Sequence, residues 1–105
     1  MSKKKPKSLF TVRGKKHERH PQIIVQSDKT GFGSVSLTHS RKKGGKNTVL
    51  LPDNPDANDS RQSYFAKKIV RDFKFNFTKA YRNYKLSDDD IDELIRFLER
   101  KKNQR

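Results

Sequence analysis

The chain has 105 residues, of which 30% are hydrophobic and 36% are charged, so it suits one small domain with a modest core. Its formal net charge of +14 favours a polyanionic partner, above all nucleic acid. The absence of cysteine excludes disulfides and thiolate chemistry, and no apolar run is long enough to span a membrane or to form a signal-peptide core. We therefore expect a cytoplasmic protein with no membrane partner.

The positive charge is concentrated in the first half of the chain. Residues 1–48 carry 13 Lys and Arg against two acidic residues, a net charge of +11, whereas residues 49–105 carry 13 against 10, a net charge of +3. A basic half of this kind binds polyanions by releasing their counterions. We expect a disordered basic tail over residues 1–8, one domain over residues 9–102 and a short tail over residues 103–105.

The first forty residues predict short strands. SLFTV (Ser8–Val12) favours a short strand, and RGKKHERH (Arg13–His20) is a polar, basic loop. PQIIVQ (Pro21–Gln26) has the β-branched run of a buried strand, and turn residues separate it from the next strand, Phe32–Thr38. These two strands are expected to form a β-hairpin.

The middle of the chain continues the predicted sheet. RKKGGKN (Arg41–Asn47) is a flexible basic loop, and TVLL (Thr48–Leu51) is a third core strand. PDNPDANDSR (Pro52–Arg61) is dense in Pro, Asn and Asp, which predicts a long turn. SYFAKKIV (Ser63–Val70) is a fourth strand with a less regular pattern.

The aromatic segment DFKFNFTKAYRNY (Asp72–Tyr84) fits two patterns. Phe73, Phe75 and Phe77 alternate as in a strand, whereas helical spacing links Phe77 to the two tyrosines that follow. We expect an extended segment and then a helical turn. Phenylalanines can stack on bases, but in a chain this short of apolar residues we expect these three in the core or in a dimer contact.

LSDDDIDELIRFLERKK carries the signals of a C-terminal helix. Ser87 is a good N-cap, and Asp90 stands three residues later, as in a short capping box. The acidic first turn and the basic last turn both complement the helix dipole. The apolar stripe expected to pack on the sheet consists of Ile91, Leu94, Ile95 and Leu98. Short strands before a terminal helix predict an α+β fold, as a small closed or half-closed β-barrel.

The polar residues of the predicted hairpin suit one reaction, the cleavage of RNA without a metal ion. RNA carries its own nucleophile, the 2′-hydroxyl, so a protein need only move protons and neutralise the phosphate. A histidine such as His20, the hydroxyl of Thr38 and an arginine supply such groups. The simpler interpretation is that His20 only begins a strand and Thr38 only ends one, and composition and spacing alone favour it. We expect no cofactor, and no metal at the histidine trio His17, His20 and His39.

Several motifs share one resemblance. HPQIIVQSDKTG, followed by GSVSLTHS, resembles the core of PemK/MazF-like toxins, the ribonucleases of type II toxin–antitoxin pairs. SRQSYFAKKIV resembles a later strand of that family, and KLSDDDIDELIRFL resembles its C-terminal helix. The resemblance covers about residues 19–98. It implies an SH3-like barrel that forms a homodimer, cleaves single-stranded RNA without metal and is neutralised by an antitoxin protein.

The resemblance also implies site residues. The family's catalytic pair is an Arg just before the Pro and the Thr that closes the next strand. Thr38 matches this threonine, but His20 stands at the Arg position, with Arg19 one residue earlier. Three alternatives follow: His20 takes over proton transfer, Arg19 reaches the phosphate after a loop shift, or the site is inactive. The catalytic candidates are therefore Arg19, His20 and Thr38.

RNA is the expected partner, ahead of DNA. The basic and polar candidates for contacting it are Lys15, Lys16, His39, Ser40, Arg41, Lys42, Lys43, Lys46 and Arg61. Two other functions stay open. One is a non-catalytic nucleic-acid-binding barrel with a regulatory role on a mobile element. The other is a partner-binding module that docks through the helix Ser87–Lys102 or through an exposed groove.

Overall fold

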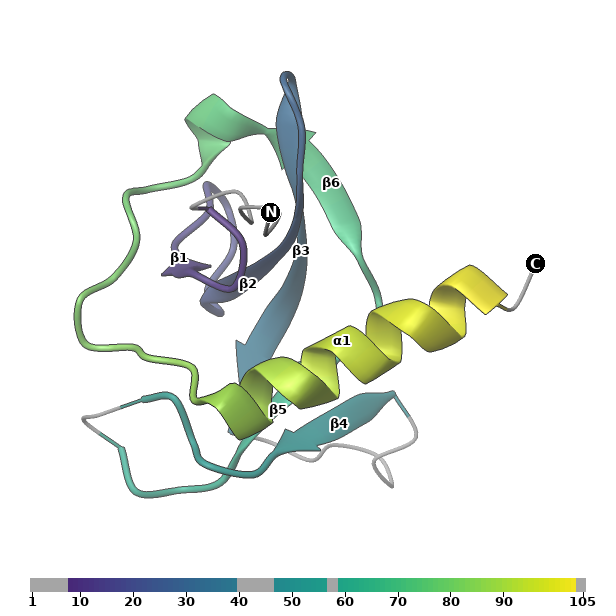
Figure 1. Ribbon diagram of the computed structural model, residues 1–105. Helices are drawn as coiled ribbons and strands as arrows, with labels where there is room; N and C mark the ends of the chain where they lie inside the picture. The colour runs from purple at the N-terminus through teal and green to yellow at the C-terminus, as the bar shows by residue number, and fades with distance from the viewer. Residues whose placement is uncertain (1–7, 40–46, 57–58, 104–105) are drawn as a thin grey trace, which may run out of the picture.

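The computed structural model describes residues 8–39, 47–56 and 59–103, and within these ranges it is an α+β fold, as the sequence predicts. An antiparallel sheet is followed by one helix near the C-terminus (Figure 1). The elements in chain order are β1 (Val12–Arg13), β2 (Gln22–Ser27), β3 (Gly31–Thr38), β4 (Thr48–Leu51), β5 (Ser63–Ala66), β6 (Val70–Phe73), a 3₁₀ turn (Lys74–Asn76) and α1 (Asp88–Asn103).

The long strand β3 organises the sheet. β2 runs along one of its edges and forms the predicted hairpin with it. Its other edge is shared, because β6 pairs with the first half of β3 and β5 pairs with its end. Leu37 pairs with Phe65, and Ser34 pairs with Val70. Between these two pairs β3 contributes residues 35–36, whereas the chain from β5 to β6 contributes residues 66–69, which is two residues more. The excess forms an irregular bend between β5 and β6, and the predicted single strand Ser63–Val70 is therefore split in two.

The described strands do not close into a barrel. Their order is β1-β2-β3-β5-β4, with β6 beside β3, so β1 and β4 lie at the two ends. Backbone hydrogen bonds of 2.8–2.9 Å join residues 76–81 to residues 12–16 and bridge part of the opening beside β1. A Cβ atom at Gly14 would overlap the hydroxyl of Tyr81, so a glycine is what allows these two segments to approach.

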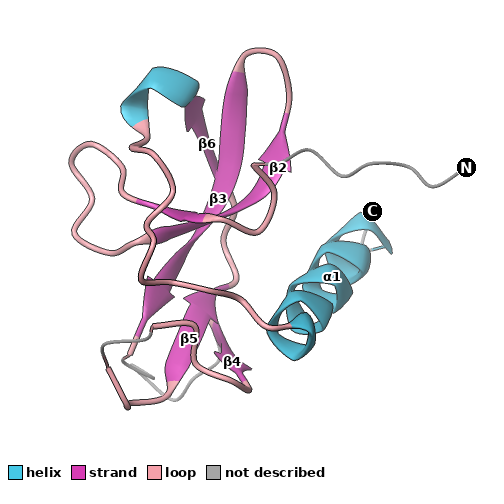
Figure 2. Ribbon diagram, turned by 60° about the vertical axis from the view of Figure 1, so that its left-hand side comes forward, coloured by secondary structure: helices cyan, strands magenta, loops and turns pink. Residues whose placement is uncertain are grey.

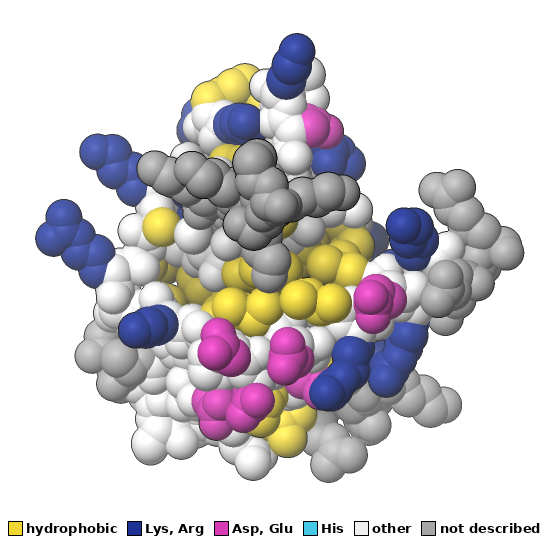
Figure 3. All heavy atoms as spheres, viewed as in Figure 1, with side chains coloured by type: hydrophobic (Ala, Val, Ile, Leu, Met, Phe, Trp, Pro, Cys, Tyr) yellow, Lys and Arg dark blue, Asp and Glu magenta, His cyan; other side chains and the backbone are white. Residues whose placement is uncertain are grey.

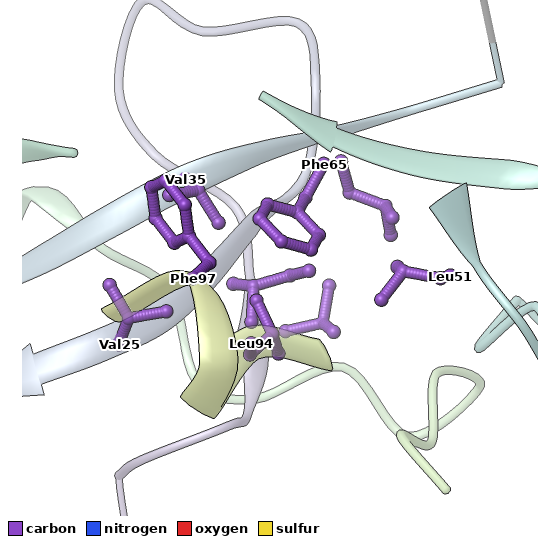
Figure 4. Packing of buried hydrophobic residues seen from close by; sticks show 9 residues of the cluster. Val25, Val35, Leu51, Phe65, Leu94 and Phe97 are labelled. Atoms are coloured by element: carbon purple, nitrogen blue, oxygen red, sulfur yellow. The ribbon is translucent and has the colours of Figure 1, made fainter. Parts of the chain in front are cut away.

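The hydrophobic core lies between the sheet and α1. Figure 2 shows α1 on one side of the strands, and Figure 4 shows side chains from both layers interdigitating. Phe65 is fully buried, and its ring meets that of Phe97 edge-on, with centroids 5.3 Å apart. Val35 and Leu94 are also fully buried beside them. Among the described helices, none combines the length and the apolar character needed to cross a membrane.

The start of α1 has the predicted capping box. The hydroxyl of Ser87 accepts a hydrogen bond from the Asp90 N–H at 3.1 Å, and the Asp90 carboxylate accepts one from the Ser87 N–H at 3.3 Å. Leu94 of the predicted stripe is buried, while its other members are partly buried. The buried face also includes Phe97, which the predicted stripe omits.

Two other expectations about local structure are wrong. Residues 8–10 form a turn rather than a strand, because both the N–H and the hydroxyl of Thr11 donate to the carbonyl of Ser8. The helical turn of the aromatic segment comes early, at Lys74–Asn76, and leaves Phe73 and Phe75 exposed instead of in the core. Most of the predicted tail over residues 1–8 lies outside the described residues.

Candidate functional site

A cleft of about 290 Å³ lies where the chain enters β2 and leaves β3. The hairpin register explains which residues meet there. Gln22 pairs with Ser36, and the Leu37 N–H donates to the Pro21 carbonyl at 2.8 Å, so the same register sets His20 opposite Thr38. The cleft is lined by His20, Pro21, Leu37, Thr38, His39, Arg61 and Tyr84.

The structure brings together some of the predicted site residues and separates others. His20 and Thr38 line the cleft with His39 and Arg61, whereas Arg19 is exposed and is not among its lining residues. Lys15 and Lys16 lie beside the aromatic segment, near the opposite end of β3. Five further candidates, in the basic loop after β3, lie outside the described residues: Ser40, Arg41, Lys42, Lys43 and Lys46.

A hydrogen-bond network fixes the ring of His39. Its Nδ1 lies 3.2 Å from the carbonyl oxygen of Gln62 and 3.3 Å from Oγ of Ser63. The Ser63 hydroxyl donates its own proton to Oδ1 of Asn54 at 2.6 Å, so it can only accept from the histidine. Both partners of Nδ1 are therefore acceptors, and Nδ1 carries a proton.

The other ring nitrogen of His39 faces two carboxylates. Its Nε2 lies 3.5 Å from Oδ2 of Asp56 and 3.3 Å from Oδ2 of Asp59. Carboxylate oxygens only accept hydrogen bonds, so a proton on Nε2 would face one of these two acceptors. Through its two ring nitrogens His39 ties the long turn between β4 and β5 to the end of β3.

Arg61 neutralises one of these two carboxylates. Its Nε and terminal nitrogen reach both oxygens of Asp59, at 2.6–3.1 Å, and its backbone N–H adds a third donor. These bonds, the guanidinium first, hold the pKa of Asp59 well below its usual range. The Arg61 side chain is still 70% exposed, so its guanidinium can meet a phosphate as well as Asp59.

Tyr84 closes the cleft from the segment that precedes α1. A β-bridge joins it to Asp56, and the Lys85 N–H donates to the Pro55 carbonyl at 2.9 Å. Burial, followed by the charge of Asp56 and a hydrogen bond to it, raises the pKa of the phenol, so Tyr84 enters the cleft as a neutral hydroxyl.

Sequence reasoning missed Tyr84, Asp56 and Asp59 as members of this site. It assigned Asp59 to turn formation, and the Asx-type hydrogen bonds in the turn bear out that role. The only signal in the sequence was the number of polar residues in Pro52–Arg61, which does not say which strand end the turn folds against.

His39, Asp56 and Asp59 offer ligand atoms that all lie within 4.8 Å of one another. One imidazole and two carboxylates suit a divalent metal ion. Such an ion would have to displace the Arg61 guanidinium from Asp59. As built, the group is a polar cluster in which Arg61 binds Asp59 and the His39 ring faces both carboxylates.

The cleft combines the groups that phosphodiester chemistry requires. His20 is exposed, and the hydroxyl-bearing residues Thr38 and Tyr84 line the same hollow. His39 and the Arg61 guanidinium lie beside the long turn. An imidazole, hydroxyl donors and a guanidinium within one cleft can move a proton and bind a phosphate together.

No protein-family model matches this chain, and no curated protein matches its sequence. The function is therefore argued from the geometry of the cleft and from the charge of the chain.

Proposed function

We propose that this protein binds single-stranded RNA and cleaves it at the cleft between β2 and β3, without a metal. The observation that carries the proposal is the position of His20 opposite Thr38, in a hollow that also holds His39 and Arg61. A net charge of +14 adds the electrostatic attraction that brings an RNA strand to the surface.

The proposed reaction is an internal transfer at phosphorus. The RNA 2′-oxygen attacks the adjacent phosphorus as His20 removes the proton of the 2′-hydroxyl, and the bond from phosphorus to the 5′-oxygen breaks. His39 donates a proton to that departing oxygen and regains one from solvent. The products are a 2′,3′-cyclic phosphate and a free 5′-hydroxyl. Arg61 and the Thr38 hydroxyl stabilise the charge on the phosphate oxygens.

The biological role that we propose is that of the toxin in a toxin–antitoxin pair. It rests on the motif resemblance described above, in which Thr38 corresponds to the family's catalytic threonine, and the open sheet is compatible with a small barrel-like fold. An antitoxin segment bearing acidic residues would then compete with RNA for the cleft.

One observation favours a second candidate, a non-catalytic RNA-binding protein. Asp56 and Asp59 already engage the His39 ring and the Arg61 guanidinium, which lessens the action of these two groups on a phosphate. In that case the same basic surface holds RNA and leaves it intact.

Incubating the purified protein with long single-stranded RNA in EDTA separates the two candidates. We expect cleavage with 2′,3′-cyclic phosphate ends, and a loss of about 10²–10³-fold in rate for His20→Ala. Thr38→Ala should cleave slowly, and Thr38→Ser, which keeps the hydroxyl, should retain most of the activity. RNA that is retarded on a gel but stays uncut would show that the protein only binds.

A modified substrate tests the two histidine roles. Sulfur in place of the 5′-bridging oxygen is a better leaving group and needs no proton. Cleavage of this RNA should therefore be restored for His39→Ala but not for His20→Ala. Equal rescue of both variants, or of neither, would contradict the assignment of base and acid.

A further inference from the structure

The end of the molecule opposite the cleft carries two exposed aromatic rings. Phe73, at the end of β6, is 58% exposed, and Phe75, in the 3₁₀ turn, is 73% exposed, the two highest values for large hydrophobic side chains in the described ranges. Their rings stack on each other, with centroids 5.4 Å apart and planes inclined by 8°. A pair of parallel rings facing solvent is an unusual use of apolar surface in a chain with so few apolar residues.

Two lysines lie near this end of the sheet. Lys16 Nζ lies 6.0 Å from the centroid of the Phe75 ring, and Lys74, between the two phenylalanines in sequence, places its Nζ 5.4 Å from the centroid of the Phe32 ring. Figure 3 shows hydrophobic side chains among Lys and Arg side chains over this end of the molecule. One lysine therefore lies near the exposed pair and another over the buried Phe32 ring of the adjacent strand, while the Asp72 carboxylate beside Phe73 is paired with Lys15 at 3.6 Å.

A hollow of about 240 Å³ adjoins the Phe73 ring, and its lining residues are Thr30, Gly31, Arg71, Asp72 and Phe73. Gly31 is the cross-strand partner of Phe73, so no side chain from that position of β3 covers the ring. Arg71, two residues before Phe73 on the same face of β6, is held by Asp28 at 2.6 Å. A flat group that enters this hollow meets Phe73 and Arg71, and also Asp72.

We propose that Phe73 and Phe75 form a stacking platform for unpaired bases of single-stranded RNA, whose phosphates pair with Lys16, Lys74 and Arg71. Every base has a flat π-face, so stacking of this kind requires no particular sequence. A second copy of the chain fits the same patch less well, because it would bring these cations against their own equivalents. An RNA strand instead supplies a negative charge at every nucleotide.

The platform extends the proposed function, on which it rests for the identity of its ligand. The two sites lie at opposite ends of β3, separated by seven residues, which corresponds to roughly 23 Å along an extended strand. One RNA strand of several nucleotides spans this distance. It is held by its bases at Phe73 and cut at Thr38.

The platform is tested by the binding of a fluorescent oligouridylate of roughly 12 nucleotides, measured through its fluorescence anisotropy. We expect Phe73→Ala and Phe75→Ala each to weaken binding about tenfold, with little change in the salt dependence of the affinity. Phe75→Trp keeps a stacking face and should bind at least as well as the wild type. Leu50→Ala, which removes another exposed apolar side chain, from β4, should have no effect. Unchanged binding by both alanine variants would overturn the platform.

Two further measurements identify other occupants and separate the two proposals. If the wild type sediments as a dimer and Phe75→Ala as a monomer with unchanged RNA affinity, the patch is an interface between copies of this chain, and the platform is refuted. Cleavage of a dinucleotide, too short to reach from Thr38 to Phe73, should be equal in Phe75→Ala and the wild type. Weak binding by Phe75→Ala with no RNA cleavage by the wild type would uphold the platform and refute the nuclease.

Discussion

The two ends of β3 differ in how their charges are held. At the Thr38 end, His39 and Arg61 are fixed by the carboxylates of Asp56 and Asp59, and the polar groups face one cleft. At the Gly31 end, two aromatic rings are exposed, and the carboxylates of Asp28 and Asp72 pair with Arg71 and Lys15 beside them, while Lys16 lies near the Phe75 ring. Chemistry on a phosphate needs groups in fixed positions, whereas stacking on bases needs only an open aromatic face. The same strand thus supports a rigid site and an accessible one.

The largest expected effect is that substitutions at the two ends change different quantities. A substitution at the Thr38 end should lower the cleavage rate, whereas one at the Gly31 end should lower the affinity for RNA. His20→Ala should lower the rate at saturating RNA by about 10²–10³-fold, because it removes the proposed base. Phe75→Ala should instead raise the RNA concentration needed for half-maximal rate and leave the saturated rate near that of the wild type. Single-turnover kinetics over a range of RNA concentrations measures both quantities. A loss of saturated rate in Phe75→Ala would break the distinction between the ends.

A substitution at the base of α1 should affect the cleft end alone. The buried Asp90 carboxylate accepts from the N–H groups of Ser87 and Asp53, and so joins α1 to the turn that carries Asp56. Asp90→Ala leaves these donors without a partner and should lower the free energy of unfolding by about 2 kcal/mol, against about 1 kcal/mol for Ser87→Ala. Urea denaturation measures both losses.

Hydrogen exchange can localise the effect of these helix-cap variants. In Asp90→Ala the amides of the turn between β4 and β5 should exchange faster than in the wild type, while those of β6 stay protected. Equal loosening of β6 would show that the two ends of β3 are not independent.

Removing the carboxylate that binds Arg61 should change affinity and rate in opposite directions. Asp59→Asn takes one negative charge from the cleft, so RNA affinity at low salt should rise severalfold. It also removes the group that holds Arg61 and His39 in place, so the rate should fall. Asp88→Asn, an equal charge change in the exposed first turn of α1, is the matched control and should alter neither quantity appreciably. Parallel titration and cleavage assays compare the variants.

The smallest effect is a pH dependence at the Gly31 end. Backbone N–H groups of Thr30 and Gly31, the former first, together with the Thr30 hydroxyl and Arg71, lower the pKa of Asp28 to about 2 from 3.8. Since the pKa of Asp28 is lowered in the folded state, the ionised carboxylate stabilises the fold. This stabilisation is fully present above about pH 4 and is lost as the pH falls towards 2. The amide resonances of Thr30 and Gly31 should shift over this range in NMR spectra. In Asp28→Asn they should not, and a similar shift in that variant would assign the change to another group.

Local signals in the sequence were enough for several elements. The β-branched run Ile23–Val25 and the turn after it predicted the hairpin, and Thr48–Leu51 was predicted with the bounds that the structure gives. Ser87 and Asp90 predicted the start of α1, because a capping box uses only residues within one turn of each other. The prediction failed where a local pattern was outweighed by pairing with β3, as in the division of Ser63–Val70 into two strands.

The sequence by itself determined the net charge, the hairpin and the capped helix, because each of these depends on composition or on neighbours a few residues apart. The turn of the hairpin did not by itself set His20 opposite Thr38, because the register shifts by one residue between Ile24 and Gln26, and the sequence did not predict this irregularity. Only the tertiary structure decided that the turn carrying Asp56 and Asp59 folds against His39, and that Phe73 faces solvent. Contacts between residues far apart in the chain depend on how α1 and the bent sheet pack, and no short stretch of sequence encodes that arrangement.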